Sequence, residues 1–223
     1  MSQNVRLSEP IWNATKTLGF LAVSITLTFL VTTAALSTGA LAQESTYNYG
    51  YYTNANLAGV PDASMFVVNP GSKGGTSPGG DLCANIYVLS ADQQMQECCS
   101  CKVTPNGLIG FSLNKDLTSN PFSGPLTVGA IKIVSSAVPS SGSCQERRPA
   151  FSGPDAGTDY KAFGLLGTWI THVHQTTVGA FSVSETGFFP SGLPDTELTK
   201  LQDECFALVS SGTGRGICSC GRE

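Results

Sequence analysis

The eight cysteines are the residues whose type and spacing offer this sequence the most chemistry. They form a Cys-Cys-x-Cys motif in the middle of the chain, a Cys-x-Cys motif near its end and three single positions. Clustered thiolates can hold zinc or an iron–sulfur cluster, whereas an even number of cysteines in an exported chain is typical of disulfides. We expect four disulfides rather than a metal or redox site, formed by Cys83, Cys98, Cys99, Cys101, Cys144, Cys205, Cys218 and Cys220.

The pairing of these cysteines stays open, because spacing alone cannot choose among the many connectivities that eight cysteines allow. Successive residues of a strand point to opposite faces, so Cys99 and Cys101 share a face that Cys98 does not. Cys98 and Cys99 are therefore expected to have different partners. We expect the C-terminal Cys-x-Cys motif to be joined to the Cys-Cys-x-Cys strand or to Cys205.

The two histidines, His172 and His174, are separated by one residue in a predicted strand and so lie on one face. Several β-barrel metalloenzymes present two imidazoles to one metal in this way. In the cupin pattern a glutamate follows shortly after, but this chain has Thr177 and Val178 there, and the nearest glutamate is Glu185. We expect no cofactor, and a secreted metal-dependent enzyme that uses His172 and His174 is the alternative function.

The remaining residues give no prediction of catalysis. The acidic residues show no pattern typical of a general acid paired with a general base. A nucleophilic triad would have to form beside the strand that carries the only two histidines. We therefore assign no catalytic residue and favour a non-catalytic role.

Residues 43–63 form a segment rich in Tyr, Asn and Gly, which we interpret as an N-terminal arm. If this arm is extended, alternate tyrosines project from one face. Such a stripe could stack on sugar rings or add an edge strand to a partner. Its tyrosines are the candidate contact surface: Tyr47, Tyr49, Tyr51 and Tyr52.

Residues 64–223 are expected to form a single disulfide-rich β domain. Between Leu82 and Leu113, apolar residues alternate or form short runs, and turn signals separate them, which predicts a meander of consecutive antiparallel strands. Pro194 and the apolar stripe that follows it predict a helix over about 194–210. The fold class is mainly β: a disulfide-stapled antiparallel β-sandwich of about seven strands with one C-terminal α-helix.

The first 42 residues predict a signal peptide, with a positive flank, an apolar run and the small-x-small triplet Ala40-Leu41-Ala42. The alternative is an uncleaved anchor, because the run approaches the length that spans a bilayer. Only 13% of the residues are charged and the net charge is -4, so no electrostatic footprint for nucleic acid exists. We expect a secreted, periplasmic or cell-surface protein, with no nucleic-acid partner and no membrane association after cleavage.

The run LCANIYVLSADQQMQECCSCKVTPNGL, together with DLTSNP, IKIVSS, TWITHV and GICSCG, resembles a group of uncharacterised exported bacterial proteins with a CCxC…CxC cysteine framework. The resemblance covers most of the chain after residue 42. It implies a recurring secreted, cysteine-rich domain and transfers no functional residue. The expected function is a secreted or cell-envelope binding or structural module, whose partner is an envelope component or a second copy of the chain.

Overall fold

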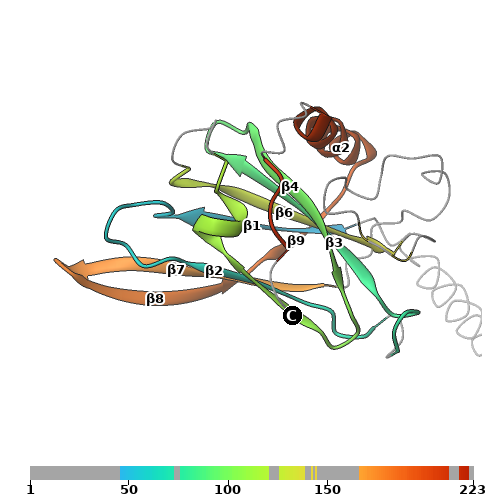
Figure 1. Ribbon diagram of the computed structural model, residues 1–223, viewed down its shortest axis with the longest axis horizontal. Helices are drawn as coiled ribbons and strands as arrows, with labels where there is room; N and C mark the ends of the chain where they lie inside the picture. Colours follow the sequence, from blue (N-terminus) through green and yellow to red (C-terminus); the bar gives the residue numbers. More distant parts are fainter. Residues whose placement is uncertain are drawn as a thin grey trace, which may run out of the picture. The chain divides into compact units, whose positions relative to one another are not determined.

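The computed structural model describes residues 46–72, 76–120, 126–138, 142, 144, 166–210 and 216–220. Within them the chain forms two antiparallel sheets that enclose a common core, with one α-helix on the outside (Figure 1). This architecture confirms the predicted disulfide-stapled β-sandwich with a C-terminal helix. The predicted signal peptide, residues 1–42, lies outside the described residues.

The described strands outnumber the predicted seven. The elements are β1 (Thr46–Thr53), β2 (Ser64–Val68), β3 (Leu82–Ser90), β4 (Met95–Val103), β5 (Leu108–Ser112), the π-helix η1 (Leu113–Leu117), β6 (Val128–Ala137), β7 (Gly167–Thr177), β8 (Ala180–Gly187), β9 (Phe189–Gly192) and α2 (Asp195–Ser210). The five-stranded sheet has the order β4-β3-β6-β1-β9, and the four-stranded sheet has the order β5-β2-β7-β8. Among the described residues, no helix is long and apolar enough to cross a membrane.

Strand β3 is buried on both faces because it lies between two covering layers. Its residues Ala84, Ile86 and Val88 belong to the core between the two sheets. Tyr87 points the other way and packs with Leu201 of α2 in a second, smaller cluster. Because its side chains alternate, β3 contributes residues both to the main core and to the surface on which α2 packs.

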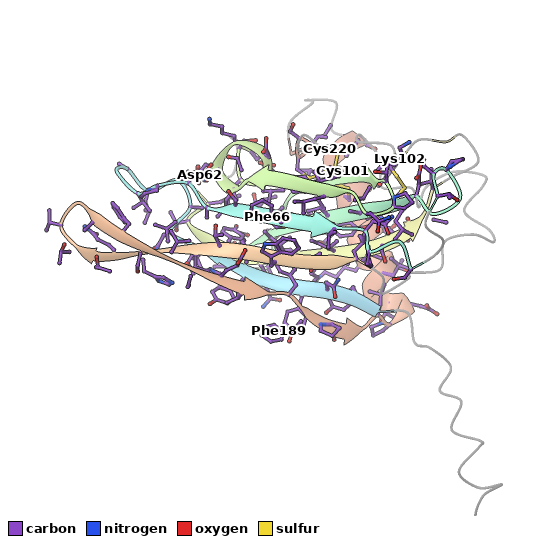
Figure 2. All side chains as sticks on the ribbon, turned by 90° about the horizontal axis from the view of Figure 1, so that it is seen from below. Asp62, Phe66, Cys101, Lys102, Phe189 and Cys220 are labelled. Carbon is purple, nitrogen blue, oxygen red and sulfur yellow. A yellow bond between two sulfur atoms is a disulfide. The ribbon has the colours of Figure 1, made fainter. Side chains whose placement is uncertain are left out.

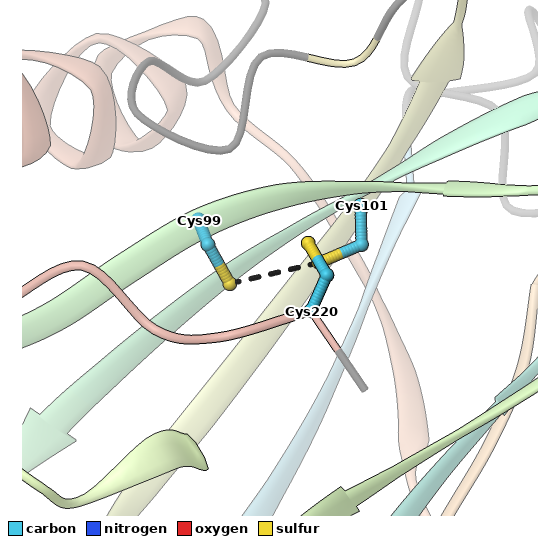
Figure 3. Close-up of side chains that lie close together, drawn as sticks. All are labelled: Cys99, Cys101 and Cys220. Atoms are coloured by element: carbon cyan, nitrogen blue, oxygen red, sulfur yellow. Dashed lines mark hydrogen bonds between the residues drawn. A yellow bond between two sulfur atoms is a disulfide. The ribbon is translucent and has the colours of Figure 1, made fainter. Parts of the chain in front are cut away.

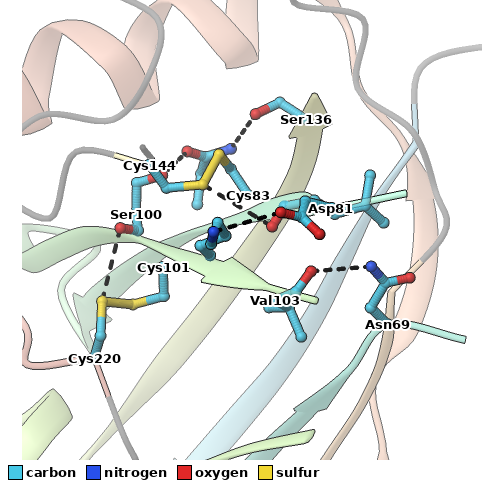
Figure 4. The surroundings of a disulfide bond; sticks show 12 residues. Asn69, Asp81, Cys83, Ser100, Cys101, Val103, Ser136, Cys144 and Cys220 are labelled. Carbon is cyan, nitrogen blue, oxygen red and sulfur yellow. Dashed lines mark hydrogen bonds and ion pairs between the residues drawn. A yellow bond between two sulfur atoms is a disulfide. The ribbon is translucent and has the colours of Figure 1, made fainter. Parts of the chain in front are cut away.

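The predicted meander is wrong at one point, because β4 and β5 are not neighbours in a sheet. β4 pairs with β3, whereas β5 pairs with β2 in the opposite sheet. The turn between them crosses from one sheet to the other and is held by the buried Asn69. Asn69 accepts a backbone hydrogen bond from Asn106 at 2.8 Å and donates one from its side chain to the Val103 carbonyl at 3.0 Å (Figure 4). The turn between β4 and β5 was predicted correctly, but a turn sequence does not show whether the two strands that it connects pair with each other.

The disulfides follow the strand alternation of β4. Cys99 and Cys101 point into the main core, whereas Cys98 belongs to the cluster beneath α2. Cys98 and Cys99 accordingly have different partners, as predicted, and the C-terminal Cys-x-Cys motif is joined to β4. The four bridges are Cys83–Cys144, Cys98–Cys205, Cys99–Cys218 and Cys101–Cys220.

The predicted N-terminal arm is not an arm over residues 46–53. These residues form β1, which pairs with β6 on one side and with β9 on the other. Tyr52 points into the core, has no exposed surface and donates a hydrogen bond to the Leu89 carbonyl at 3.2 Å. The many polar residues of this segment resemble an arm, but Tyr is a good strand former, and its ring can be buried when its hydroxyl is bonded.

The chain passes from one sheet to the other at Phe188, between β8 and β9. The Phe188 amide donates a hydrogen bond to the Thr168 carbonyl at 2.9 Å, and its ring packs over Gly50 of β1. A Cβ atom at position 50 would lie 2.6 Å from this ring. The absence of a side chain at Gly50 therefore makes room for the Phe188 ring at this corner.

Gly50→Ala is expected to lower the free energy of unfolding by about 2 kcal/mol, because the new methyl group overpacks the corner. Urea denaturation followed by circular dichroism measures this loss. The double variant Gly50→Ala/Phe188→Leu has a smaller side chain at the clash and should cost less than the sum of its two single changes. If the losses of unfolding free energy from the two single changes are strictly additive, contact with the Phe188 ring is not the reason that a methyl group at position 50 is destabilising.

Candidate functional site

A strip of aromatic rings follows the outer face of the five-stranded sheet at its β1–β9 edge. Tyr49 and Phe189 are cross-strand partners with ring centroids 5.8 Å apart, and Tyr47 lies 6.1 Å from Tyr49. Tyr51 continues the row along β1. We call these four side chains the aromatic strip. Figure 2 shows its member Phe189 on the opposite side of the sandwich from Cys101 and Cys220.

The aromatic strip becomes exposed where the cover provided by α2 ends. Tyr47 packs against the cluster beneath the helix, and the Lys132 ammonium group lies 5.7 Å from the centre of its ring. Lys132 is itself ion-paired with Glu197 of α2. Beyond this point the side chains of Tyr49, Tyr51 and Phe189 are 42%, 49% and 57% exposed. Tyr49 and Phe189 therefore face solvent side by side, and Tyr51 is exposed further along β1.

Tyr51 is held in place by a histidine from the other sheet. Its ring stacks on His172 of β7, with centroids 4.5 Å apart and planes inclined by 22°. His172 is buried, and its Nε2 atom shares a hydrogen bond with the Thr186 hydroxyl at 2.7 Å. Burial, and to a smaller extent the neighbouring His174, lower the pKa of His172. A neutral imidazole at neutral pH suits this apolar stack, so His172 orients Tyr51.

The predicted histidine pair does lie together on one face of β7. The two ring centroids are 6.4 Å apart, and the Nε2 atom of the exposed His174 shares a hydrogen bond with Ser184 at 2.8 Å. Glu185 pairs with Thr171, so it lies on the opposite face of the hairpin from the histidines. Across the described ranges, the structure brings no third His, Cys, Asp or Glu ligand to the pair. Each imidazole of the pair is thus held by a hydroxyl group, and the ring that stacks on His172 is that of Tyr51.

Potential ligands gather elsewhere, at the cysteines of β4 and the C-terminal tail. The Sγ atoms of Cys99, Cys101 and Cys220 all lie within 4.8 Å of one another (Figure 3). All three cysteines are in disulfides, so none offers a thiolate. Cys98 and Cys101 have the spacing of a C-x-x-C redox motif, but they point to opposite faces of β4 and pair with distant residues. The cluster therefore joins the C-terminal tail covalently to β4.

One serine has the sequence context of a hydrolase nucleophile. Ser77 lies in a G-x-S-x-G pentapeptide that the sequence reasoning above did not single out. This motif presents a nucleophile only when it forms a sharp turn from a strand into a helix. Here it lies in the loop between the strands β2 and β3. The fold does not provide the elbow, and we assign Ser77 no catalytic role.

A buried carboxyl group at the end of the core is the titratable residue that sequence reasoning missed. Glu97 of β4 has no exposed surface, and its Oε1 atom accepts hydrogen bonds from the Asn120 amide and the Ser119 hydroxyl. Among the described residues its Oε2 atom has no partner. Burial raises the pKa of Glu97 to about 7, although the bonds from Asn120 and Ser119 oppose the rise. Without solvent access, this group acts on stability rather than on a substrate.

The predicted contact tyrosines divide into two groups. Tyr49 and Tyr51 are exposed and Tyr47 is half-buried beside them, whereas Tyr52 is wholly in the core and is excluded from the surface. Phe189 was missed because it reaches Tyr49 only through the pairing of β1 with β9, which are far apart in the sequence. Comparison with protein-family models, with curated proteins and with solved structures finds no match to this chain.

Proposed function

We propose that this chain is a secreted or cell-envelope binding module without catalytic activity, and that the aromatic strip is its contact surface. The observation that carries this proposal is the exposure of Tyr49 and Phe189 side by side on one sheet edge, with Tyr51 exposed further along the same strand. Contiguous exposed apolar surface on a folded domain marks an interaction site more often than chance. Rings fixed on paired strands also bind with little loss of conformational freedom.

The chemistry of the aromatic strip favours a glycan. Its rings are apolar on their faces, and Tyr adds a hydroxyl that can bond to a polar ligand at the rim. Among the described residues, the cation that contacts the strip is Lys132, which is ion-paired with Glu197. A sugar ring offers an apolar face and a polar rim without requiring charge, so polysaccharides of a cell envelope or matrix are the ligand class that we propose.

Export is supported by two features of the chain. The leader-like first 42 residues and the four disulfides both agree with an oxidising compartment. The disulfides also suit a module that must stay folded outside the cell. These features support the proposed location and do not bear on the ligand.

Co-sedimentation with insoluble peptidoglycan, chitin and cellulose tests the proposal. We expect the wild-type protein to bind at least one of them, and Tyr49→Ala or Phe189→Ala to weaken that binding about 3- to 10-fold, the loss of one stacking interaction. Leu108→Ala is the matched control, because Leu108 is 45% exposed on β5 in the other sheet.

His174→Ala separates the binding module from a metal-dependent enzyme. His174 is exposed and does not stack on Tyr51, so a binding module should keep its glycan affinity when this imidazole is removed. A metal-dependent enzyme would lose bound metal and turnover. Failure to bind any of the three polysaccharides, or equal binding by wild type and both strip variants, overturns the proposal.

A further inference from the structure

The long edge of the four-stranded sheet is a strand with little protection against pairing. β8 spans eight residues, Ala180–Gly187, and among the described strands its one neighbour in the sheet is β7. It contains no Pro, Lys or Arg, and its one charged residue is Glu185. Proteins normally block an exposed edge of this length with such residues or cover it, because its free backbone groups can pair with another chain.

The other sheet edges show such devices within the described residues. The tail at Ile217 runs beside β4 in a parallel bridge, and the Cys98 amide donates a hydrogen bond to the Gly216 carbonyl at 2.9 Å. β9 has four residues, one of which is Pro190, and β5 has five. Among the described edge strands, β8 is thus the one that is both long and uncovered.

The hairpin that carries β8 is also exposed on both faces at its outer end. Figure 1 shows β7 and β8 extending past the other strands. Val178 at the tip is 98% exposed and Val183 is 64% exposed. A two-stranded ribbon is marginally stable in water, so an added neighbour would stabilise it.

We propose that β8 pairs with β8 of a second copy of this chain, antiparallel about a two-fold axis, and joins the two four-stranded sheets into one. An antiparallel strand edge is complementary to itself under this symmetry. The segment from Gln175 to Ser184 carries no charge, so two copies of the acidic chain meet there without repulsion. With the axis at any residue from 182 to 184, Glu185 of one copy faces an uncharged residue of the other.

Sedimentation equilibrium of the disulfide-intact protein tests the pairing, with Val183→Lys as the disrupting variant. Wild type is expected to form a dimer, and Val183→Lys to raise the dimer Kd at least about 10-fold, because it places two like charges near the axis. Val178→Lys is the control, since it adds the same charge outside the strand. Circular dichroism and intact mass verify that each variant is folded with four disulfides.

Hydrogen exchange on the wild-type protein gives a second readout that needs no variant. Protection of the amides of residues 180–187 is expected to rise at least about 10-fold from dilute to concentrated protein. A protein that stays monomeric up to about 1 mM overturns the proposal. The proposal is also overturned if Val183→Lys weakens the dimer no more than Val178→Lys does. It is overturned as well if the protection of the β8 amides does not depend on protein concentration.

Discussion

A variant that lacks both bridges between the two Cys-x-Cys motifs is expected to lose about 5 kcal/mol of unfolding free energy, whereas a variant lacking either one alone loses about 2 kcal/mol. The bridges Cys99–Cys218 and Cys101–Cys220 join the same two short segments. Once one of them is closed, the other restricts only a few further residues of the unfolded chain. Their effects should therefore be coupled rather than additive.

The size of this effect depends on a third bridge. Cys98–Cys205 already ties β4 to α2, so the first Cys-x-Cys bridge closes only the path from Cys205 to Cys218. That path of about 15 residues is worth about 3 kcal/mol in the chain-entropy description, and the second bridge adds about 2 kcal/mol. The sequence separation of 119 residues alone would suggest a larger value for the first bridge.

Guanidinium denaturation of four proteins measures the coupling: wild type, Cys99→Ala/Cys218→Ala, Cys101→Ala/Cys220→Ala, and the quadruple variant. The quadruple variant should lose about 1 kcal/mol more than the two pair variants combined. Mass spectrometry after alkylation verifies that the remaining cysteines stay paired. If the quadruple variant loses only the sum of the losses of the two pair variants, the two bridges stabilise the fold independently and the expected coupling is absent.

Glu97→Gln is expected to stabilise the protein by about 3 kcal/mol at pH 8 and to leave its stability almost unchanged at pH 4. The folded state holds the Glu97 carboxyl in its neutral form, with a pKa of about 7, against a value of 4.5 when the group is solvated. Neutral Glu97 is compatible with burial at low pH. As the pH rises from about 4.5 to 7, the unfolded chain releases this proton first, and wild-type stability falls.

Glutamine keeps the shape of a protonated carboxyl group and cannot ionise. Its carbonyl oxygen can accept the hydrogen bonds from Asn120 and Ser119 that Oε1 accepts in the wild type. Urea unfolding of both proteins at pH 4, 5.5 and 8 measures the difference, and Glu185→Gln removes the same charge from an exposed strand as the control. Parallel stability curves of wild type and Glu97→Gln across this range would show that Glu97 is not buried as a neutral acid.

Local patterns in the sequence were sufficient for the elements whose own residues carry a regular apolar pattern. Ala84, Ile86 and Val88 identified β3, the Cys-Cys-x-Cys run identified the two faces of β4, and the apolar stripe after Pro194 predicted α2 within one residue of its bounds. In each case a single strand or helix carries the signal. The different partners of Cys98 and Cys99 follow from the same alternation.

Features that depend on pairing between distant segments were not predictable in this way. β1 has tyrosines on both faces, so its sequence does not show which side is buried. The burial of Glu97 results from Ser119 and Asn120, which reach it from beyond β5, and Tyr51 meets His172 only when the sheets are assembled. The site combines residues that no local pattern connects.

The double attachment of the tail to β4 has a mechanical consequence. A pulling force applied beyond Cys220 passes through the bridge to Cys101 and does not load the backbone between these two residues. While the bridge is intact, the 119-residue separation between them is excluded from the extensible length. At about 3.5 Å per residue, this segment is on the order of 400 Å of extended chain that bears no tension.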